Sequence, residues 1–263
     1  GACGYQGTKL IPILLSKKHK ITAIDTQWFG NKLKKHKNLK NIKKNILDIK
    51  DKDLKGIEIV IHLASIANDP MGDLDKNLTW EVSCIGTMKL MEFAVKNKVR
   101  KFIYASSASV YGIKKEKKVI ETLSLKPIST YNKAKMIAEK TILSYSNKID
   151  VTIIRPATVC GVSPRMRFDL TVNEFTKVLA SGKELVVYGE QFWRPYCHVK
   201  DFALLIHKVI SAKDSLTSYQ IFNAGGNKNN FTKKNIAYTI RDEIGGNIVL
   251  LKKSQDKRNY VVD

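Results

Sequence analysis

Two residues with acid–base chemistry, Tyr131 and Lys135, stand four positions apart in the chain. The apolar spacing of 132–144 predicts a helix, which would place both side chains on one face. A lysine ammonium beside a phenol favours the phenolate and lowers the phenol pKa from its usual value of about 10. Such a phenolate could take a proton from a substrate hydroxyl while hydride leaves the same carbon. An exposed pair on a helix surface is the alternative interpretation.

A run of serines precedes this pair in the sequence. Ser107 follows the apolar stretch 101–105, which is typical of a buried strand. A hydroxyl at the carboxyl end of such a strand can hydrogen-bond the reacting oxygen of a substrate. We therefore expect Ser107 to share one site with Tyr131 and Lys135.

Gly1, Gly4 and Gly7 form a Gly-x-x-Gly-x-x-Gly loop that leads into a second helical pattern. Glycines allow a tight turn and let the backbone approach a pyrophosphate at the helix N-terminus. Three glycines in seven residues also occur by chance, so the context matters. The apolar run 21–25 ends in Asp25, whose carboxylate could accept from both ribose hydroxyls of an adenosine and repel a 2′-phosphate. No arginine follows within 26–31, which favours NAD over NADP, although Asp25 could instead be a helix cap or turn residue.

These residues need a scaffold, and the apolar periodicity of the chain indicates one. Short runs rich in apolar residues predict strands at 21–25, 57–63, 101–105, 151–155, 184–188 and 220–223. Helical spacing appears between several of them, at 8–18, 87–97 and 132–144. Strands that alternate with helices imply an α/β fold, a doubly wound parallel sheet of the Rossmann kind. Ligands of such sheets bind at the carboxyl ends of the strands.

We expect two regions: an NAD-binding domain over 1–155, and a smaller C-terminal α/β region over 156–263 that binds the substrate. The strand near 220–223 is expected to return to the first sheet. A phosphate-binding loop normally follows a strand, yet this one opens at Gly1. We therefore expect the natural protein to carry a further apolar strand just before Gly1, paired on both edges in the centre of the sheet.

Composition excludes several other classes of protein. The 263 residues are 43% hydrophobic and 27% charged, which indicates a globular chain, and no apolar run is long enough to predict a membrane span. The net charge of +22 comes mostly from lysine. Because the lysine-rich stretches 32–55 and 114–118 lack interleaved aromatic residues, they indicate a solvated basic surface rather than a nucleic-acid site.

The four cysteines form no Cys-x-x-Cys pair, so we expect neither a zinc site nor any other metal. Free cysteines are usually small buried residues, and they persist as thiols in a reducing compartment. The start of the chain has no signal-peptide pattern. Together these features predict a cytoplasmic protein.

Taken together, these motifs resemble the extended short-chain dehydrogenase/reductases, and among them the NAD-dependent nucleotide-sugar epimerase/dehydratase group. The resemblance extends over essentially the whole chain. The motifs that carry it are the loop 1–7, Asp25, Asp48 with Ile49, 62–64, Gly86 with Thr87, Ser106 with Ser107, 110–112, Tyr131 with Lys135, Arg155 with Pro156, 187–189, Arg194, Val199 with Asp201, Phe222 with Asn223, and Arg258.

The resemblance implies a role for individual residues. Tyr131 would be the acid/base, Lys135 its partner and a ligand of the nicotinamide ribose, and Ser107 the ligand of the substrate oxygen. The other implied NAD contacts are Gly1, Gly4, Tyr5, Gln6, Gly7, Asp25, Asp48, Ile49, Leu63, Ala64 and Pro156. The implied ligands of the substrate diphosphate are Arg194 and Arg258, because arginine binds phosphate oxygens bidentately, although either could instead pair with a helix. Arg165 is a further candidate, for a diphosphate or a sugar carboxylate, with a salt bridge at a helix start as the alternative.

The resemblance also implies an activity. The dehydratases of the group carry an Asp-Glu pair where this chain has Ala108 and Ser109, and neither residue can expel water. We therefore expect an NAD-dependent nucleotide-sugar epimerase that acts by transient oxidation at C4, in carbohydrate metabolism such as cell-surface polysaccharide synthesis. The alternatives are a net oxidoreductase on the same substrates, or a non-catalytic NAD-binding relative. The resemblance further implies a homodimer.

Overall fold

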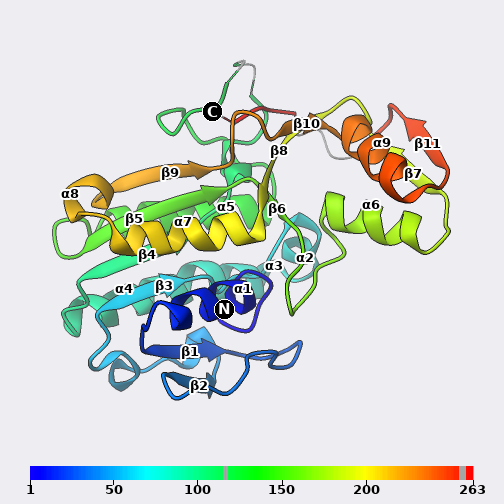
Figure 1. Cartoon of the computed structure of the whole chain (residues 1–263). Coiled ribbons are helices and arrows are strands. Elements are labelled where there is room, and N and C mark those ends of the chain that lie inside the picture. Colours follow the sequence, from blue (N-terminus) through cyan, green and yellow to red (C-terminus); the bar gives the residue numbers. More distant parts are fainter. Residues whose placement is uncertain (115, 117, 255–258, 263) are drawn as a thin grey trace.

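The computed structural model describes residues 1–114, 116, 118–254 and 259–262. Its centre is a four-stranded parallel sheet in the order β3-β4-β5-β9, formed by β3 (Ile59–His62), β4 (Lys101–Ala105), β5 (Asp150–Pro156) and β9 (Gln220–Ala224). A second parallel pair, β1 (Ile21–Asp25) and β2 (Leu39–Lys43), lies beyond β3 (Figure 1). The predicted α/β fold with parallel strands is confirmed.

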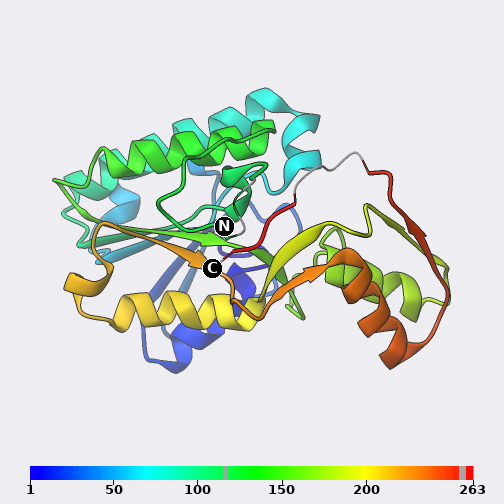
Figure 2. The same ribbon diagram turned by 90° about the horizontal axis from the view of Figure 1, so that it is seen from above.

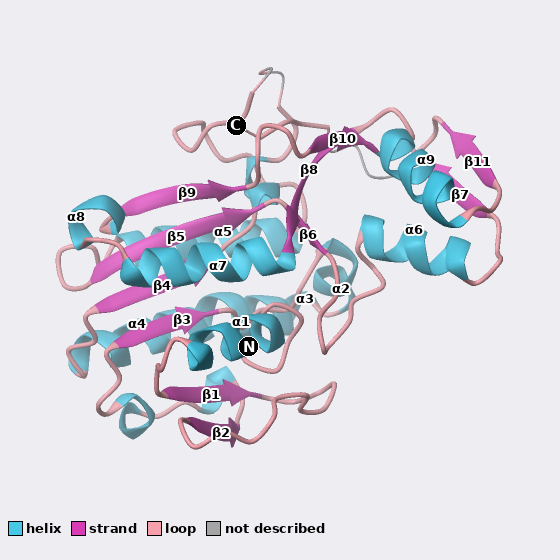
Figure 3. Cartoon of the chain, in the orientation of Figure 1, coloured by secondary structure: helices cyan, strands magenta, loops and turns pink. Residues whose placement is uncertain are grey.

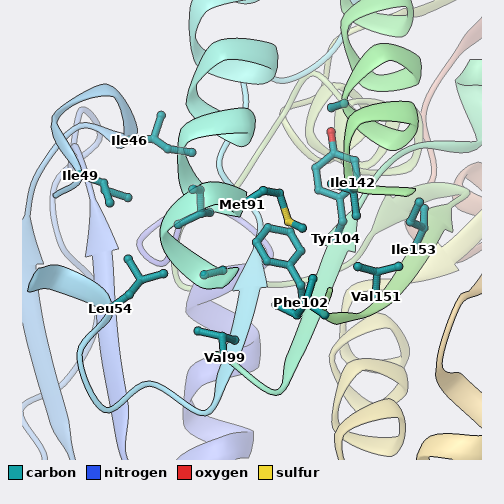
Figure 4. Packing of buried hydrophobic residues seen from close by; sticks show 14 of the residues in the cluster. Ile46, Ile49, Leu54, Met91, Val99, Phe102, Tyr104, Ile142, Val151 and Ile153 are labelled. Atoms are coloured by element: carbon teal, nitrogen blue, oxygen red, sulfur yellow. The ribbon is translucent and has the colours of Figure 1, made fainter. Parts of the chain in front are cut away.

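Helices cover both faces of the central sheet (Figure 2). On one face lie α4 (Gly86–Lys96) and α5 (Thr130–Leu143), and on the other α1 (Gly7–Ser16) and α7 (Val199–Ser211). Side chains of β4 alternate between the two layers, because successive residues of a strand point to opposite faces. Phe102 and Tyr104 pack with α4 and α5 (Figure 4), whereas Ile103 packs with α1 and α7.

Gly1 lies between the two groups of strands. Its backbone nitrogen is 2.9 Å from the Ile24 carbonyl oxygen at the end of β1. On its other side, a Cβ added to Gly1 would lie 2.6 Å from the Ala64 nitrogen, just after β3. The loop therefore begins at the carboxyl edge of the sheet. The strand expected before Gly1 concerns residues outside this sequence and stays a prediction.

The C-terminal part of the chain forms smaller sheets beside this core (Figure 3). Strands β6 (Thr158–Cys160), β8 (Trp193–His198) and β10 (Asn230–Thr232) pair in the order β10-β8-β6, and β7 (Leu185–Tyr188) pairs in parallel with β11 (Ile248–Leu251). Helices α6 (Thr171–Ala180) and α9 (Lys233–Ile244) pack on the β7–β11 pair. Helix α7 and strand β9 also come from the C-terminal half of the sequence, yet they pack on the first sheet. The predicted boundary between the two regions at 155/156 stays a prediction.

Short elements complete the structure. They are the helices α2 (Asp69–Leu74), α3 (Lys76–Trp80) and α8 (Asp214–Thr217), the 3-10 turns Ile46–Asp48, Asp51–Leu54 and Ala108–Tyr111, and the π-helical turn Glu81–Ile85. Among the described residues, no helix has both the length and the apolar character needed to cross a membrane.

Candidate active site

The predicted catalytic pair, Tyr131 and Lys135, lies at the start of α5, and Lys135 reaches the carboxyl end of β4. The hydroxyl of Ser129 caps the helix by accepting from the Asn132 backbone N–H at 3.2 Å. One turn later, the Lys135 ammonium donates to the Ala105 carbonyl at 2.8 Å. Its Nζ lies 6.0 Å from the centroid of the Tyr131 ring. The helix periodicity thus places Tyr131 and Lys135 on one face, as the sequence predicts.

The Lys135 side chain is buried, and burial changes its titration. Desolvation penalises the ammonium and lowers the Lys135 pKa to about 7, while the Glu139 carboxylate one turn later partly offsets this. The ammonium also lies 4.8 Å from the centroid of the buried Tyr104 ring. A lysine that exchanges its proton near neutral pH is typical of a functional site, because structural lysines rarely need so large a shift.

Ser107 follows β4 and begins a hydrogen-bonded series of side chains that leads to α5. Its Oγ lies 2.7 Å from the Ser109 Oγ, and the Ser109 hydroxyl donates to the Asn132 Oδ1. Since Asn132 directly follows Tyr131, this series connects the loop after β4 with the start of α5. Sequence reasoning missed the positioning role of Ser109 and Asn132, although both are polar residues inside otherwise recognised motifs.

Helix α2 packs closely against Tyr131 at Gly72. A Cβ added to Gly72 would lie 2.9 Å from the Tyr131 Cβ, so α2 can approach this closely only with glycine. At the start of α2, the Asp69 carboxylate accepts from the hydroxyl of Ser129, the residue that caps α5. The sequence offered no signal for this contact, because it joins residues distant in the chain.

The glycine loop has no room for a side chain at Gly1 or Gly7. A Cβ on Gly7 would lie 2.4 Å from the Ala2 carbonyl oxygen, and the Thr8 backbone N–H donates to the Gly4 carbonyl at 3.0 Å. Helix α1 begins at Gly7, directly after Tyr5 and Gln6. The loop therefore presents backbone and a helix N-terminus at the carboxyl edge of the sheet, an arrangement that fits the pyrophosphate of a dinucleotide.

Asp25 connects this loop with the turn that follows β1. Its Oδ2 accepts from the Cys3 backbone N–H at 3.0 Å, and its Oδ1 accepts from the Gln27 backbone N–H at 2.6 Å. The carboxylate is thus fixed beside the glycine loop. This position fits the adenosine ribose that the resemblance assigns to it.

We expect replacement of Asp25 with Asn to weaken NAD binding and to reduce the discrimination against NADP. Asn retains one acceptor oxygen, enough for one of the two backbone N–H groups, and removes the charge that repels a 2′-phosphate. Titration calorimetry of both cofactors with the native protein and the variant measures the effect. A native protein that already prefers NADP, or a variant with an unchanged preference, contradicts the assignment.

Other residues implied for the cofactor lie in different environments. Leu63 and Ala64 follow β3 beside Gly1, and Pro156 ends β5 next to Ala224 of β9. Asp48 is exposed at the end of its 3-10 turn, whereas the neighbouring Ile49 is buried in the hydrophobic core (Figure 4). The Ile49 side chain therefore contributes to packing, and its contact with adenine stays a prediction.

The two described arginines among those expected at the substrate, Arg194 and Arg165, contact different parts of the structure. Arg194, on β8, is buried, with its guanidinium 5.5 Å from the centroid of the Tyr260 ring. Arg165 instead lies 3.9 Å from the centroid of the Phe29 ring, in the loop that follows Asp25. The structure thus places Arg165 beside the loop that follows Asp25, and its role as a substrate ligand stays a prediction. Arg258 lies outside the described residues.

A buried ion pair connects α5 to β5 of the central sheet. The Arg155 guanidinium of β5 donates to the Glu139 carboxylate of α5, at 3.0 Å from Nε and 2.7 Å from Nη2. Its Nη1 donates to the Tyr111 hydroxyl, which in turn donates to the Asn223 Oδ1 on β9. Only 3% of the Arg155 side chain and 1% of the Glu139 side chain are exposed. This network fixes α5 one turn beyond Lys135.

Comparison with known proteins places this site in a family. The model of the NAD dependent epimerase/dehydratase family matches residues 1–225. The chain therefore belongs to this family of NAD-dependent enzymes. The glycine cradle and the fixed Asp25 carboxylate fit that cofactor. No group of three or more metal-ligating side chains occurs within the part of the chain that the structure describes.

Several individual proteins that are similar to this chain are described as UDP-sugar epimerases. An uncharacterized UDP-glucose epimerase of Bacillus subtilis, YtcB, is 32% identical over 217 residues, which cover 76% of this chain and 68% of the relative. A UDP-glucuronate 4-epimerase of Thermodesulfobacterium geofontis is 26% identical over 93% of this chain and 79% of its own length. The crystal structure of the UDP-glucuronic acid 4-epimerase from Bacillus cereus, in complex with UDP-glucuronic acid and NAD, covers this chain completely with 88% of its own length. Its TM-score is 0.88 at 24% identity, so it shares the fold.

Proposed function

We propose that this protein is an NAD-dependent nucleotide-sugar 4-epimerase, with a UDP-sugar as its substrate. The observation that carries the proposal is the assembly of Tyr131, Lys135 and Ser107 around the carboxyl end of β4. The names of the two relatives, both UDP-sugar epimerases, support the substrate class.

In this proposal, each residue of the site has one task. Tyr131 accepts the proton of the sugar C4 hydroxyl and later returns it. The Ser107 hydroxyl hydrogen-bonds the same oxygen and holds it against Tyr131. Lys135, fixed by the Ala105 carbonyl, favours the phenolate through its positive charge. NAD, when bound, supplies the reversible oxidation at C4.

Inversion requires that the oxidised sugar present its other face before it is reduced. The Ser107 and Tyr131 groups contact only the oxygen at C4, so they do not fix the orientation of the ring. We assign Arg194 to the diphosphate, because a guanidinium matches phosphate oxygens and would hold the nucleotide while the sugar turns. The same task for Arg258 stays a proposal from the resemblance.

The residues after Ser107 disfavour dehydration. The Ser109 hydroxyl donates to Asn132, and the side chain of Ala108 is a methyl group buried against Tyr111. Neither can donate a proton to a leaving hydroxyl and remove another from carbon, as the loss of water requires. The site therefore favours the transfer of one proton at one oxygen.

A panel of nucleotide-sugars tests the proposal. We expect the purified protein with NAD to interconvert a pair of C4 epimers, with no net accumulation of NADH and no product lighter by one water. Chromatography separates the epimers, absorbance detects NADH, and mass spectrometry detects dehydration. Net NADH formation would identify a dehydrogenase instead, and a 4-keto-6-deoxy product would overturn the role given to Ala108 and Ser109.

A further inference from the structure

We propose that residues 161–173, which comprise the connection from β6 to α6 and the first turn of α6, form a strap over the NAD site, closed by the contact between Arg165 and Phe29. In this proposal these two side chains control the rate at which NAD leaves. The inference rests on the NAD site of the proposed function but not on the reaction. It assigns Arg165 to the cofactor rather than to the substrate.

The strap is anchored on the glycine loop at its first residue. The Tyr5 hydroxyl donates to the Gly161 carbonyl at 2.7 Å and accepts from the Asn173 Nδ2 at 3.2 Å. The Asn173 Oδ1 accepts from the Gly161 backbone N–H at 2.9 Å, which ties the two ends of the strap together. Tyr5 is 5% exposed, so these bonds lie in a protected environment.

A second anchor holds the strap two residues further along. The Ser163 hydroxyl donates to the Tyr5 carbonyl at 2.7 Å, and its oxygen lies 3.0 Å from the Thr8 Oγ1. Ser163 and Thr8 are both buried. The strap is therefore fixed against the segment that would bind the pyrophosphate.

The middle of the strap reaches the opposite side of the cofactor site. The Arg165 guanidinium lies 3.9 Å from the centroid of the Phe29 ring, a distance typical of a cation–π contact. Phe29 follows Asp25 by four residues, and its own side chain is 60% exposed. Burial lowers the Arg165 pKa and the neighbouring Arg167 charge adds to this lowering, while the Asp169 and Asp25 carboxylates partly offset it.

The anchors on the glycine loop and the contact between Arg165 and Phe29 together define the space that the strap encloses. One end is fixed on the glycine loop, where the pyrophosphate is expected, and the middle contacts the loop beyond Asp25, where the adenosine is expected. A dinucleotide that extends from one loop to the other would lie beneath this bridge. Its departure would require Arg165 and Phe29 to separate, whereas the buried anchors at Tyr5 and Ser163 could remain in place.

Cofactor dissociation kinetics test this arrangement directly. We expect Arg165→Lys and Phe29→Leu each to raise the dissociation rate of NAD about tenfold, because each removes the stacked contact while retaining charge or apolar character. The double variant should dissociate no faster than either single variant, since both lose the same contact. Stopped-flow displacement of NAD from the full chain measures these rates without any turnover.

The control is Arg241→Lys on α9, where another guanidinium lies 4.5 Å from the centroid of the Tyr238 ring. We expect native NAD kinetics for this variant. Rates of the Arg165 and Phe29 variants equal to that of the control would overturn the strap and leave the epimerase proposal intact. Faster release from both variants in a protein that epimerises nothing would support the strap and reject the proposed reaction. A native protein that binds no NAD would overturn both.

Discussion

Replacement of Tyr131 with Phe is expected to lower the turnover of the nucleotide-sugar substrate by at least about 100-fold, with NAD still bound. The substitution removes the one phenol oxygen that could exchange a proton with the sugar, and general acid–base catalysis contributes roughly 10²–10⁴-fold in enzymes. The Phe ring keeps the packing against Gly72, so the start of α5 should stay in place. Steady-state kinetics and NAD titration measure the two effects separately.

Tyr145→Phe is the matched control. Tyr145 follows the same helix and also lies beside a lysine, with the Lys148 Nζ 5.7 Å from the centroid of its ring. Unlike Tyr131, it lies beyond the C-terminal end of α5, remote from Ser107. We expect this variant to turn over at the native rate. Near-normal turnover by Tyr131→Phe, or an equal loss in both variants, would remove Tyr131 from the catalytic role.

The sequence was informative where a local pattern determines the structure. Helical spacing placed Tyr131 and Lys135 on one face of α5, and the apolar run before Ser107 corresponds to β4. The glycine spacing likewise predicted a tight loop, whose close contacts the structure shows at Gly7. These features depend on residues near one another in the chain, so periodicity and turn chemistry suffice to predict them.

Elements whose stability depends on distant partners were missed. Strand β2 reads Leu-Lys-Asn-Ile-Lys, a polar sequence that becomes a strand because it pairs with β1. The short strands β6 and β10 likewise depend on pairing with β8. Intrinsic preference for strands is weak compared with pairing and burial, so such segments carry little signal of their own.

The position of Arg165 could not be predicted for a related reason. The chemistry of arginine made it a candidate ligand of the diphosphate, and this role stays a prediction, but its place in the fold depends on where residues 161–173 cross the glycine loop. The bonds that determine this crossing join Tyr5 to Gly161 and Asn173, more than 150 residues apart. The buried pair of Arg155 and Glu139 was also missed, because the sequence shows charges but not which of them become buried together.

That buried pair leads to the second large expected effect, which concerns stability. Replacement of Glu139 with Gln should destabilise the protein by about 3–5 kcal/mol, because it leaves the Arg155 guanidinium buried without its counter-charge. For a chain of this size, such a loss lowers the melting temperature by roughly 10 °C. Calorimetry or urea unfolding measures it.

An exposed ion pair on the opposite edge of the sheet provides the control for Glu139→Gln. The Arg100 Nε donates to the Glu58 carboxylate at 3.1 Å, with the Glu58 side chain 73% exposed. Water screens such pairs, so Glu58→Gln should change the unfolding free energy by no more than about 1 kcal/mol. A double variant, Glu139→Met with Arg155→Met, should recover much of the loss, because it removes both charges and fills a similar volume with apolar atoms. Equal destabilisation by Glu139→Gln and Glu58→Gln would show that the Arg155–Glu139 pair does not hold α5 against the sheet.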